Sequence, residues 1–362
     1  VLFGGSSRDG RTAPPYPYLA DTWEWDGTRW TAITPSDAPW PAARGSHGMT
    51  YDEKRGLTLV YGDRGVEPSR LWGWDGTRWH AFDTPGPGLR RHIKLAYDAS
   101  RDRTVLFSGL DDTQTQPGDT WEWDGAAWHQ VATAGPEPRS SYSLAYDPRR
   151  KRVVLFGGLS QKSGTMGDTW EWDGRAWTKM ADTGPSPRGE AGAAYDARTG
   201  TIVIAGGTTW APQTFSNGRT GWTSAPVSER PRDTWSWDGT AWRKLSDDGL
   251  SRFGAIVPDP ITGRPLRVAG QSDTALHGDL LAWTGSAWTA VDAPPIPARF
   301  FHEAAFDTRR KRLVVFGGSM GQGAVADLWE WDGSSWREIT TPAPMQATAA
   351  VQPWLGTKNT GS

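Results

Sequence analysis

The chain has 362 residues, a net charge of −2 and no cysteine, which excludes a disulfide framework and a thiolate metal site. Glycine and proline together number 44 + 27 = 71, which indicates many turns, while 24 tryptophans argue against disorder. No apolar run approaches the roughly 18–20 residues of a membrane span. The net charge is close to zero, so no overall positive charge attracts the chain to nucleic acid.

One block of sequence recurs along most of the chain. It reads Asp-Thr-Trp-Glu-Trp-Asp-Gly-x-x-Trp, as at 21–30, 119–128 and 168–177. The second tryptophan of the block stands at positions 25, 74, 123, 172, 237, 283 and 331, so the spacing is 46–49 residues with one exception of 65. A fixed period of this length is typical of repeat proteins. We therefore expect seven units, of which the fifth carries an insertion.

Each unit predicts four short strands. A polar segment ending in Tyr-Asp comes first, as at 44–52, and a β-branched run ending in Gly-Gly follows, as at 153–158. Trp-x-Trp forms the third strand, with both indoles on one face because side chains alternate along a strand. Asp-Gly is a strong signal for a hairpin turn into the fourth strand. Twenty of the 24 tryptophans occupy block positions, and we interpret them as packing between units.

Tandem four-stranded units of this kind close into a ring of blades. The fold class we predict is an all-β, seven-bladed β-propeller forming one domain over 1–362. The first unit lacks a first strand, and the tail before Met345 matches the Pro-x-Pro opening of the other first strands. We therefore expect the tail to close the ring and leave no open sheet edge. The predicted blades are 1–34 with 344–353, 44–83, 90–132, 139–181, 188–246 with the insertion 208–232, 251–291 and 299–340.

Four marks of the repeat resemble the kelch-repeat family in its bacterial, galactose-oxidase-like form. They are Phe-Gly-Gly, Asp-Thr-Trp-x-Trp-Asp-Gly, Pro-x-Pro-Arg and Tyr-Asp, and they span about residues 1–340. The resemblance implies a propeller of four-stranded blades but little about function, because this fold hosts both enzymes and binding proteins. Galactose-oxidase chemistry needs a copper site with a tyrosine cross-linked to cysteine, so the absence of cysteine excludes it. We expect no metal and no cofactor.

An arginine stands seven residues before the aromatic residue that ends most first strands. These arginines are Arg44, Arg90, Arg139, Arg188 and Arg299. Each begins its strand, so the ring predicts a circle of arginines at one mouth of the propeller. Trp40, Trp210 and Trp222 fall on the same side, and strand alternation adds Lys94 and Phe301. Clustered arginines can fork onto carboxylates or phosphates; alternatively, they cap loop carbonyls or pair with acidic neighbours.

Two hypotheses for function remain open. In the first, the protein is a binding module whose partner is an anionic small molecule or an acidic protein segment held at the arginine-lined mouth. In the second, it is a metal-free lyase, epimerase or cyclase acting on a small acidic or aromatic substrate, with Glu190, Glu303 and His92 converging from three blades as acid–base groups. We expect a monomer that is secreted or attached to the cell surface, with a cytoplasmic location left open.

Overall fold

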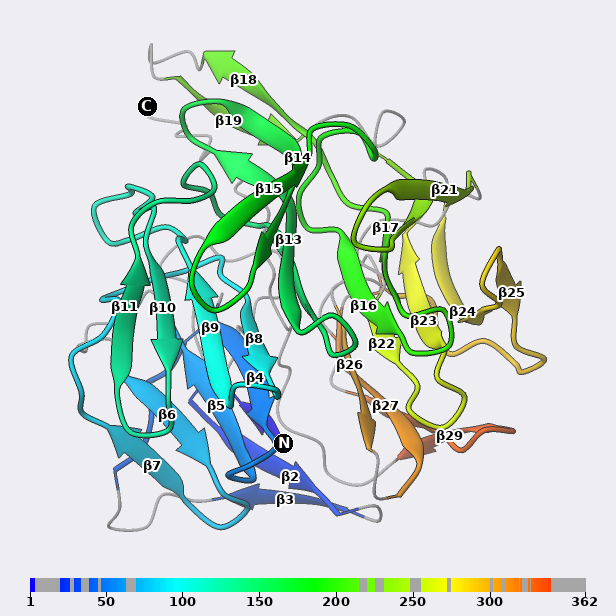
Figure 1. The fold of residues 1–362 in the computed structure, drawn as a ribbon. Coiled ribbons are helices and arrows are strands. Elements are labelled where there is room, and N and C mark those ends of the chain that lie inside the picture. Colours follow the sequence, from blue (N-terminus) through cyan, green and yellow to red (C-terminus); the bar gives the residue numbers. More distant parts are fainter. Residues whose placement is uncertain are drawn as a thin grey trace, which may run out of the picture.

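A computed structural model shows a ring of small antiparallel sheets (Figure 1). Every helix or strand assigned in the part of the chain that it describes is a β-strand. That part comprises residues 1–3, 20–26, 29–33, 39–44, 47–62, 70–214, 220–224, 231–247, 255–271, 275–299, 302–307, 310–318, 320, 325 and 327–339.

Six of the sheets are four-stranded blades. Their strands are β4 (Gly48–Asp52), β5 (Leu57–Tyr61), β6 (Leu71–Trp74) and β7 (Trp79–Phe82); β8 (Leu95–Asp98), β9 (Arg103–Phe107), β10 (Thr120–Trp123) and β11 (Trp128–Ala132); β12 (Ser143–Asp147), β13 (Arg152–Ser160), β14 (Gly164–Trp172) and β15 (Trp177–Ala181); β16 (Gly192–Asp196), β17 (Thr201–Ala205), β20 (Thr234–Trp237) and β21 (Trp242–Ser246); β22 (Ala255–Pro258), β23 (Pro265–Gln271), β24 (Leu276–Trp283) and β25 (Trp288–Ala290); and β26 (Glu303–Asp307), β27 (Arg312–Phe316), β28 (Leu328–Trp331) and β29 (Trp336–Ile339).

The prediction of seven four-stranded blades is wrong. The seventh unit is a smaller, three-stranded sheet of β1 (Leu2–Phe3), β2 (Thr22–Trp25) and β3 (Trp30–Ile33). Among the described residues, this sheet consists of three strands in the order β1-β2-β3. The tail 344–353, which we expected to add a fourth, lies outside the described residues. Phe3 packs the small sheet onto Val60 and three indoles of the β4–β7 blade.

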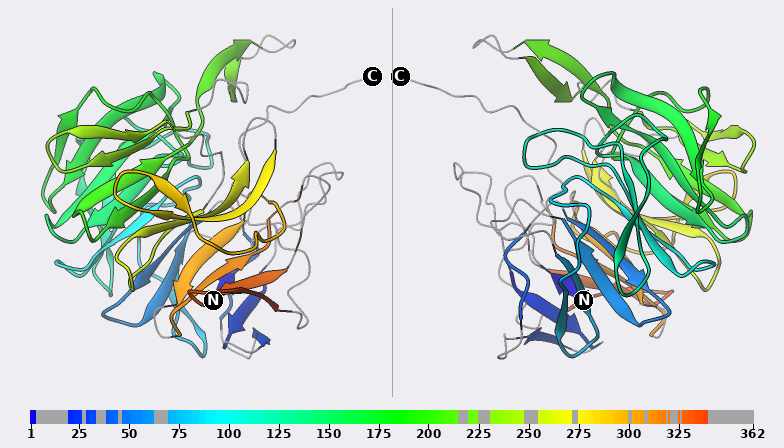
Figure 2. Two further views of the ribbon diagram at one scale, coloured as in Figure 1. Left: turned by 90° about the vertical axis from the view of Figure 1, so that its right-hand side faces the viewer. Right: turned by 60° about the vertical axis from the view of Figure 1, so that its left-hand side comes forward.

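The inner strands of the six blades, β4, β8, β12, β16, β22 and β26, follow one another around the central axis. All begin at the same end of the ring, which also carries the loops that join second strands to third strands. We call this end the loop face and the opposite end the turn face. The insertion predicted at 208–232 contributes a hairpin, β18 (Trp210–Thr214) and β19 (Thr220–Ser224), that projects from the ring (Figure 2).

The repeated block supplies hydrogen bonds that join neighbouring blades. Its threonine accepts from the third indole of the next blade, as Thr120 does from Trp177 Nε1 at 2.8 Å. Its glutamate accepts from the second indole, as Glu122 does from Trp172 Nε1 at 2.6 Å. The same contacts join Thr22 to Trp79, Thr169 to Trp242, Thr234 to Trp288, Glu24 to Trp74 and Glu171 to Trp237. The residues of the block therefore form contacts between neighbouring blades as well as the strands within each blade.

Two blades lack both residues, and their neighbours show the consequence. The β4–β7 blade carries Leu71 and Gly73, and the β22–β25 blade carries Leu280 and Ala282, where the β8–β11 and β12–β15 blades carry threonine and glutamate. In the blade that follows β4–β7, the indole nitrogens of Trp123 and Trp128 are buried without a protein hydrogen-bond partner. The ring of Phe82 lies 4.9 Å from the ring of Trp123, so apolar packing occupies this junction in place of the missing glutamate.

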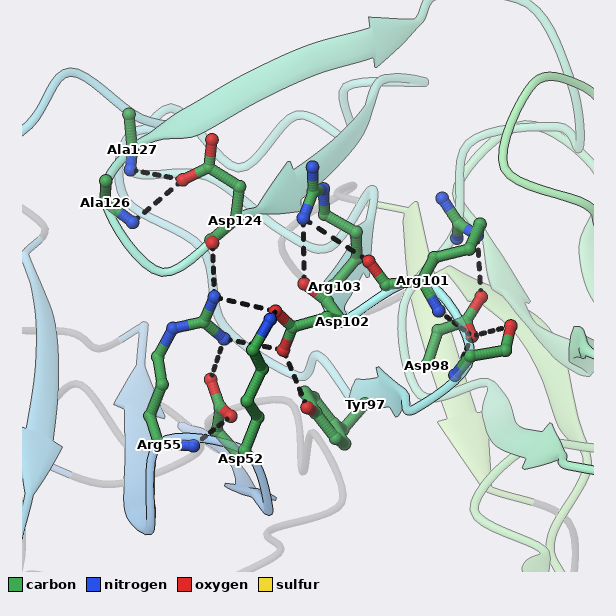
Figure 3. Close-up of polar contacts among 12 residues, drawn as sticks. Asp52, Arg55, Tyr97, Asp98, Arg101, Asp102, Arg103, Asp124, Ala126 and Ala127 are labelled. Atoms are coloured by element: carbon green, nitrogen blue, oxygen red, sulfur yellow. Dashed lines mark hydrogen bonds and ion pairs between the residues drawn. The ribbon is translucent and has the colours of Figure 1, made fainter.

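A second contact between blades uses an arginine on the turn face. Arg101 binds Asp98 and Glu122 of its own blade, both at 2.7 Å, and its guanidinium lies against Gly174 in the Asp-Gly turn of the next blade. In the β4–β7 blade, which lacks the glutamate, Arg55 instead reaches the next blade directly (Figure 3). It bonds to Asp52 at 2.7 Å, to Asp102 at 2.8 Å and to the carbonyl of Asp124 at 2.5 Å.

Candidate binding site on the loop face

The predicted arginines stand four or five residues before the inner strands, not at their first positions, and their guanidinium groups are not exposed. Arg139, Arg188 and Arg299 are each 0% exposed, and Arg44 and Arg90 are also buried. Arg139 forks onto Asp168 at 2.5 and 3.1 Å, and it also donates to the carbonyls of Gly157 and Glu137.

The same acidic partner recurs from blade to blade. Arg90 binds Asp119 at 2.9 Å, and Arg188 and Arg299 bind Asp233 and Asp327, both at 2.5 Å. In each case the aspartate is the first residue of the repeated block. Burial alone would raise the pKa of Asp168, but the hydrogen bonds and charge of Arg139 outweigh burial and lower it. The geometry therefore matches the alternative in which these arginines pair with acidic neighbours.

The remaining predicted residues are distributed differently. Trp40 packs against the indoles of the β4–β7 blade and donates to the carbonyl of Ala20 at 2.7 Å. Trp210 is 6% exposed and lies over Gly189, and Lys94 is exposed. Trp222 lies in β19 and Glu303 begins β26, but their side chains are not among those the structure describes. Phe301 lies outside the described residues.

A different set of residues distinguishes the loop face. His92, Ser141 and Glu190 stand two positions after Arg90, Arg139 and Arg188, in three consecutive blades. Their φ angles are 53°, 55° and 54°, in the left-handed region that residues other than glycine rarely adopt. All three side chains are half-buried.

These three residues are also joined by their backbones. The amide of Ser141 donates to the carbonyl of His92 at 3.0 Å, and the amide of Glu190 donates to the carbonyl of Ser141 at 2.8 Å. The two bonds cross from blade to blade, so they form a short belt around the axis. The belt fixes the three left-handed conformations and therefore holds the three polar side chains in a set arrangement. We call His92, Ser141 and Glu190 the belt residues.

The left-handed conformation carries an energetic cost of about 1–2 kcal/mol for a residue with a side chain. Glycine adopts it freely. Three blades nevertheless carry a polar side chain there. Strained residues of this kind cluster at functional sites, where the surrounding structure holds them in place. The belt is therefore the strongest candidate site in the described part of the chain.

Sequence reasoning named His92 and Glu190, but as catalytic groups, and it gave no role to Ser141. Strand alternation could not reveal the φ angles, because a left-handed residue interrupts the pleat. Counting back six residues from the aspartate at the end of each inner strand places Ser46, Phe253 and Phe301 at the aligned positions of three other repeats, so no glycine in the sequence marked a positive φ there.

Comparison with known proteins does not extend this picture. No protein-family model matches the chain, and no curated protein sequence matches it. Within the described residues, no group of three or more histidine, aspartate or glutamate side chains is placed to hold a metal ion. Nor does that part of the chain contain a helix long and apolar enough to cross a membrane.

Proposed function

We propose that this β-propeller is a kelch-type binding module that holds a small acidic ligand, or an acidic protein segment, on its loop face. In this proposal the belt residues and Lys94 contact the ligand. The buried arginines, two positions before the belt residues, hold the loops in place by binding aspartates. The observation that carries it is the retention of three polar side chains in left-handed conformations that glycine would adopt without strain.

The charges at the belt indicate the kind of ligand. Lys94 follows His92 by two residues and is exposed, so its ammonium group can meet a carboxylate. Burial, and then the positive charges of Arg44 and Lys94, lower the pKa of His47 in the preceding blade to about 3. Glu190 is an acceptor, so it favours a ligand that also carries hydroxyl or N–H donors. A carboxylated sugar combines both features, and trigalacturonate is a suitable probe.

The test replaces each belt residue by glycine, which preserves the backbone conformation and removes the side chain. Titration calorimetry with trigalacturonate should show binding to the wild-type protein and a loss of at least about tenfold in affinity for Glu190→Gly and His92→Gly, since a hydrogen bond to a charged group contributes about 1.5–3 kcal/mol. The neutral trisaccharide maltotriose should bind more weakly than trigalacturonate.

Thermal melting of the same variants supplies the control. Because glycine relieves the left-handed strain, these variants should melt at or above the wild-type temperature. A variant that binds trigalacturonate as wild type does would remove that residue from the site. A variant that loses both affinity and stability would show that the belt is only structural.

A further inference from the structure

A basic patch lies on the turn face, at the opposite end of the molecule from the belt. It belongs to the β12–β15 blade and comprises Arg149, Lys151, Arg152 and Arg175. Because Val153 pairs with Trp172, the turn that follows β12 and the turn that follows β14 leave the sheet side by side. The four cationic residues therefore gather at one end of a single blade. Arg149, Lys151 and Arg175 are exposed, and Arg152 is half-buried.

The four patch residues take no part in the ion pairs that stabilise the blade. Arg150, in the same turn, is the structural arginine and binds both Asp147 and Glu171. Among the described residues, no acidic side chain forms an ion pair within 4.0 Å of the four patch residues. Arg152 donates to the backbone carbonyls of Arg150 and Lys151. The patch thus presents more positive charge than the blade itself uses.

The backbone at Lys151 supports a role for its side chain. Lys151 has φ of 56°, and the corresponding residue of three other blades is a glycine with φ of 66–70°, namely Gly56, Gly200 and Gly263. At the same position Asp102 has φ of 59°, and there the side chain binds Lys54, Arg55 and Tyr97 (Figure 3). Among the side chains at this position, that of Asp102 has its partners within the protein, whereas those of Lys151 and Lys311 are exposed.

The surroundings of the patch limit the size of its partner. The outer turn that carries Arg175 also carries Asp173, and the corresponding turns of the two neighbouring blades carry Asp124 and Asp238; Asp173 and Asp238 are exposed. A long polyanion such as nucleic acid would run onto these carboxylates and be repelled. A short segment with a few carboxylates can meet the patch alone, and arginine forks match carboxylate geometry.

We infer that this patch docks a short acidic segment of a partner protein, independently of the ligand on the loop face. The probe is fluorescein-labelled hexaglutamate, measured by anisotropy against the full chain at low ionic strength. The variant Arg149→Gln/Lys151→Gly/Arg175→Gln should weaken its binding about tenfold, since three exposed charge pairs contribute roughly 0.2–1 kcal/mol each. Raising the salt to 0.15 M should weaken wild-type binding too.

The matched control is Lys311→Gly in the β26–β29 blade. Lys311 is exposed and occupies the same turn position with φ of 57°, but Ser334 stands where the patch has Arg175. This variant should bind hexaglutamate as wild type does. An equal loss in the control, or no loss in the triple variant, would overturn the proposal. Tighter binding of a labelled twelve-nucleotide oligothymidylate than of hexaglutamate would also overturn it, because the patch would then fit nucleic acid. A Glu190→Gly variant that retains hexaglutamate binding keeps this result separate from the belt.

Discussion

Removal of a single inner-strand arginine tests whether these residues hold the fold or contact a ligand. Arg139 is 0% exposed and makes two hydrogen bonds to Asp168, together with bonds to the carbonyls of Glu137 and Gly157 at 2.8 and 3.1 Å. In Arg139→Met a carboxylate that is 10% exposed loses its partner, as do two carbonyls. Breaking a buried pair by removing one partner costs about 3–5 kcal/mol, so we expect a loss of this size in the free energy of unfolding.

The pH dependence of that loss has a definite sign. In the wild type Arg139 keeps the pKa of Asp168 below its ordinary value, so Asp168 stabilises the fold above about pH 4, and this stabilisation is lost as the pH falls through the lowered pKa. In Arg139→Met the effect of burial, which raises the pKa of Asp168, is opposed only by the hydrogen bonds from Trp170 and the backbone, so the pKa of Asp168 should be higher than in the wild type. Protonation then relieves the buried charge. The difference in stability between wild type and variant should therefore shrink as the pH is lowered from 7 toward 4.

Guanidinium denaturation followed by tryptophan fluorescence measures both effects. The double variant Arg139→Met/Asp168→Leu should recover part of the loss, because the unpaired carboxylate is gone. Arg175→Met, on the exposed outer turn of the same blade, should change stability by less than about 0.5 kcal/mol. A loss below about 1 kcal/mol in Arg139→Met, with no change as the pH falls, would refute a structural role for this arginine.

Three other changes test the junctions between blades. Thr120→Val should cost about 1–3 kcal/mol by chemical denaturation, because Trp177 Nε1 loses its buried acceptor, whereas Thr120→Ser should retain most of the stability. Gly125→Ala should cost clearly more than Gly76→Ala, whose cost should be about 1 kcal/mol: both have φ above 90°, but a Cβ at Gly125 would meet the Arg55 guanidinium while Gly76 has open space. His302 has a pKa lowered to about 4 by burial and by nearby arginines, so the melting temperature should fall as the pH drops from about 6.5 to 4, and His302→Gln should flatten that fall.

The sequence was sufficient to predict an all-β propeller because its strongest signals are local. Alternation, Asp-Gly turns and the 49-residue period each act within one blade, and the β8–β11 blade realises all of them. The number of complete blades could not be predicted from patterns within a single blade. It depended on whether 344–353 reaches the small sheet, which no pattern within a blade determines.

The arginines show that strand face and sequence position alone do not predict the role of a residue. Spacing placed Arg139 near the entry to its inner strand, which begins at Ser143, but it could not show that Asp168, 29 residues later, lies within 2.5 Å. A signal was present, since the arginine and the first aspartate of the block occur together in four repeats. Where Arg70 replaces that aspartate, the arginine of the same repeat, Arg44, donates instead to the carbonyl of Ala42.

Carboxyl footprinting most directly tests the claim that the belt, and not the arginine ring, contacts the ligand. Carbodiimide labelling with glycine ethyl ester, read by mass spectrometry, reports the accessibility of each carboxylate. We predict that Glu190 is labelled in the free protein and protected by saturating trigalacturonate, while Asp168, Asp233 and Asp327 stay unlabelled in both states because their arginines remain paired. Unchanged labelling of Glu190 with ligand, or new labelling of those aspartates as the arginines turn to the ligand, would contradict the account.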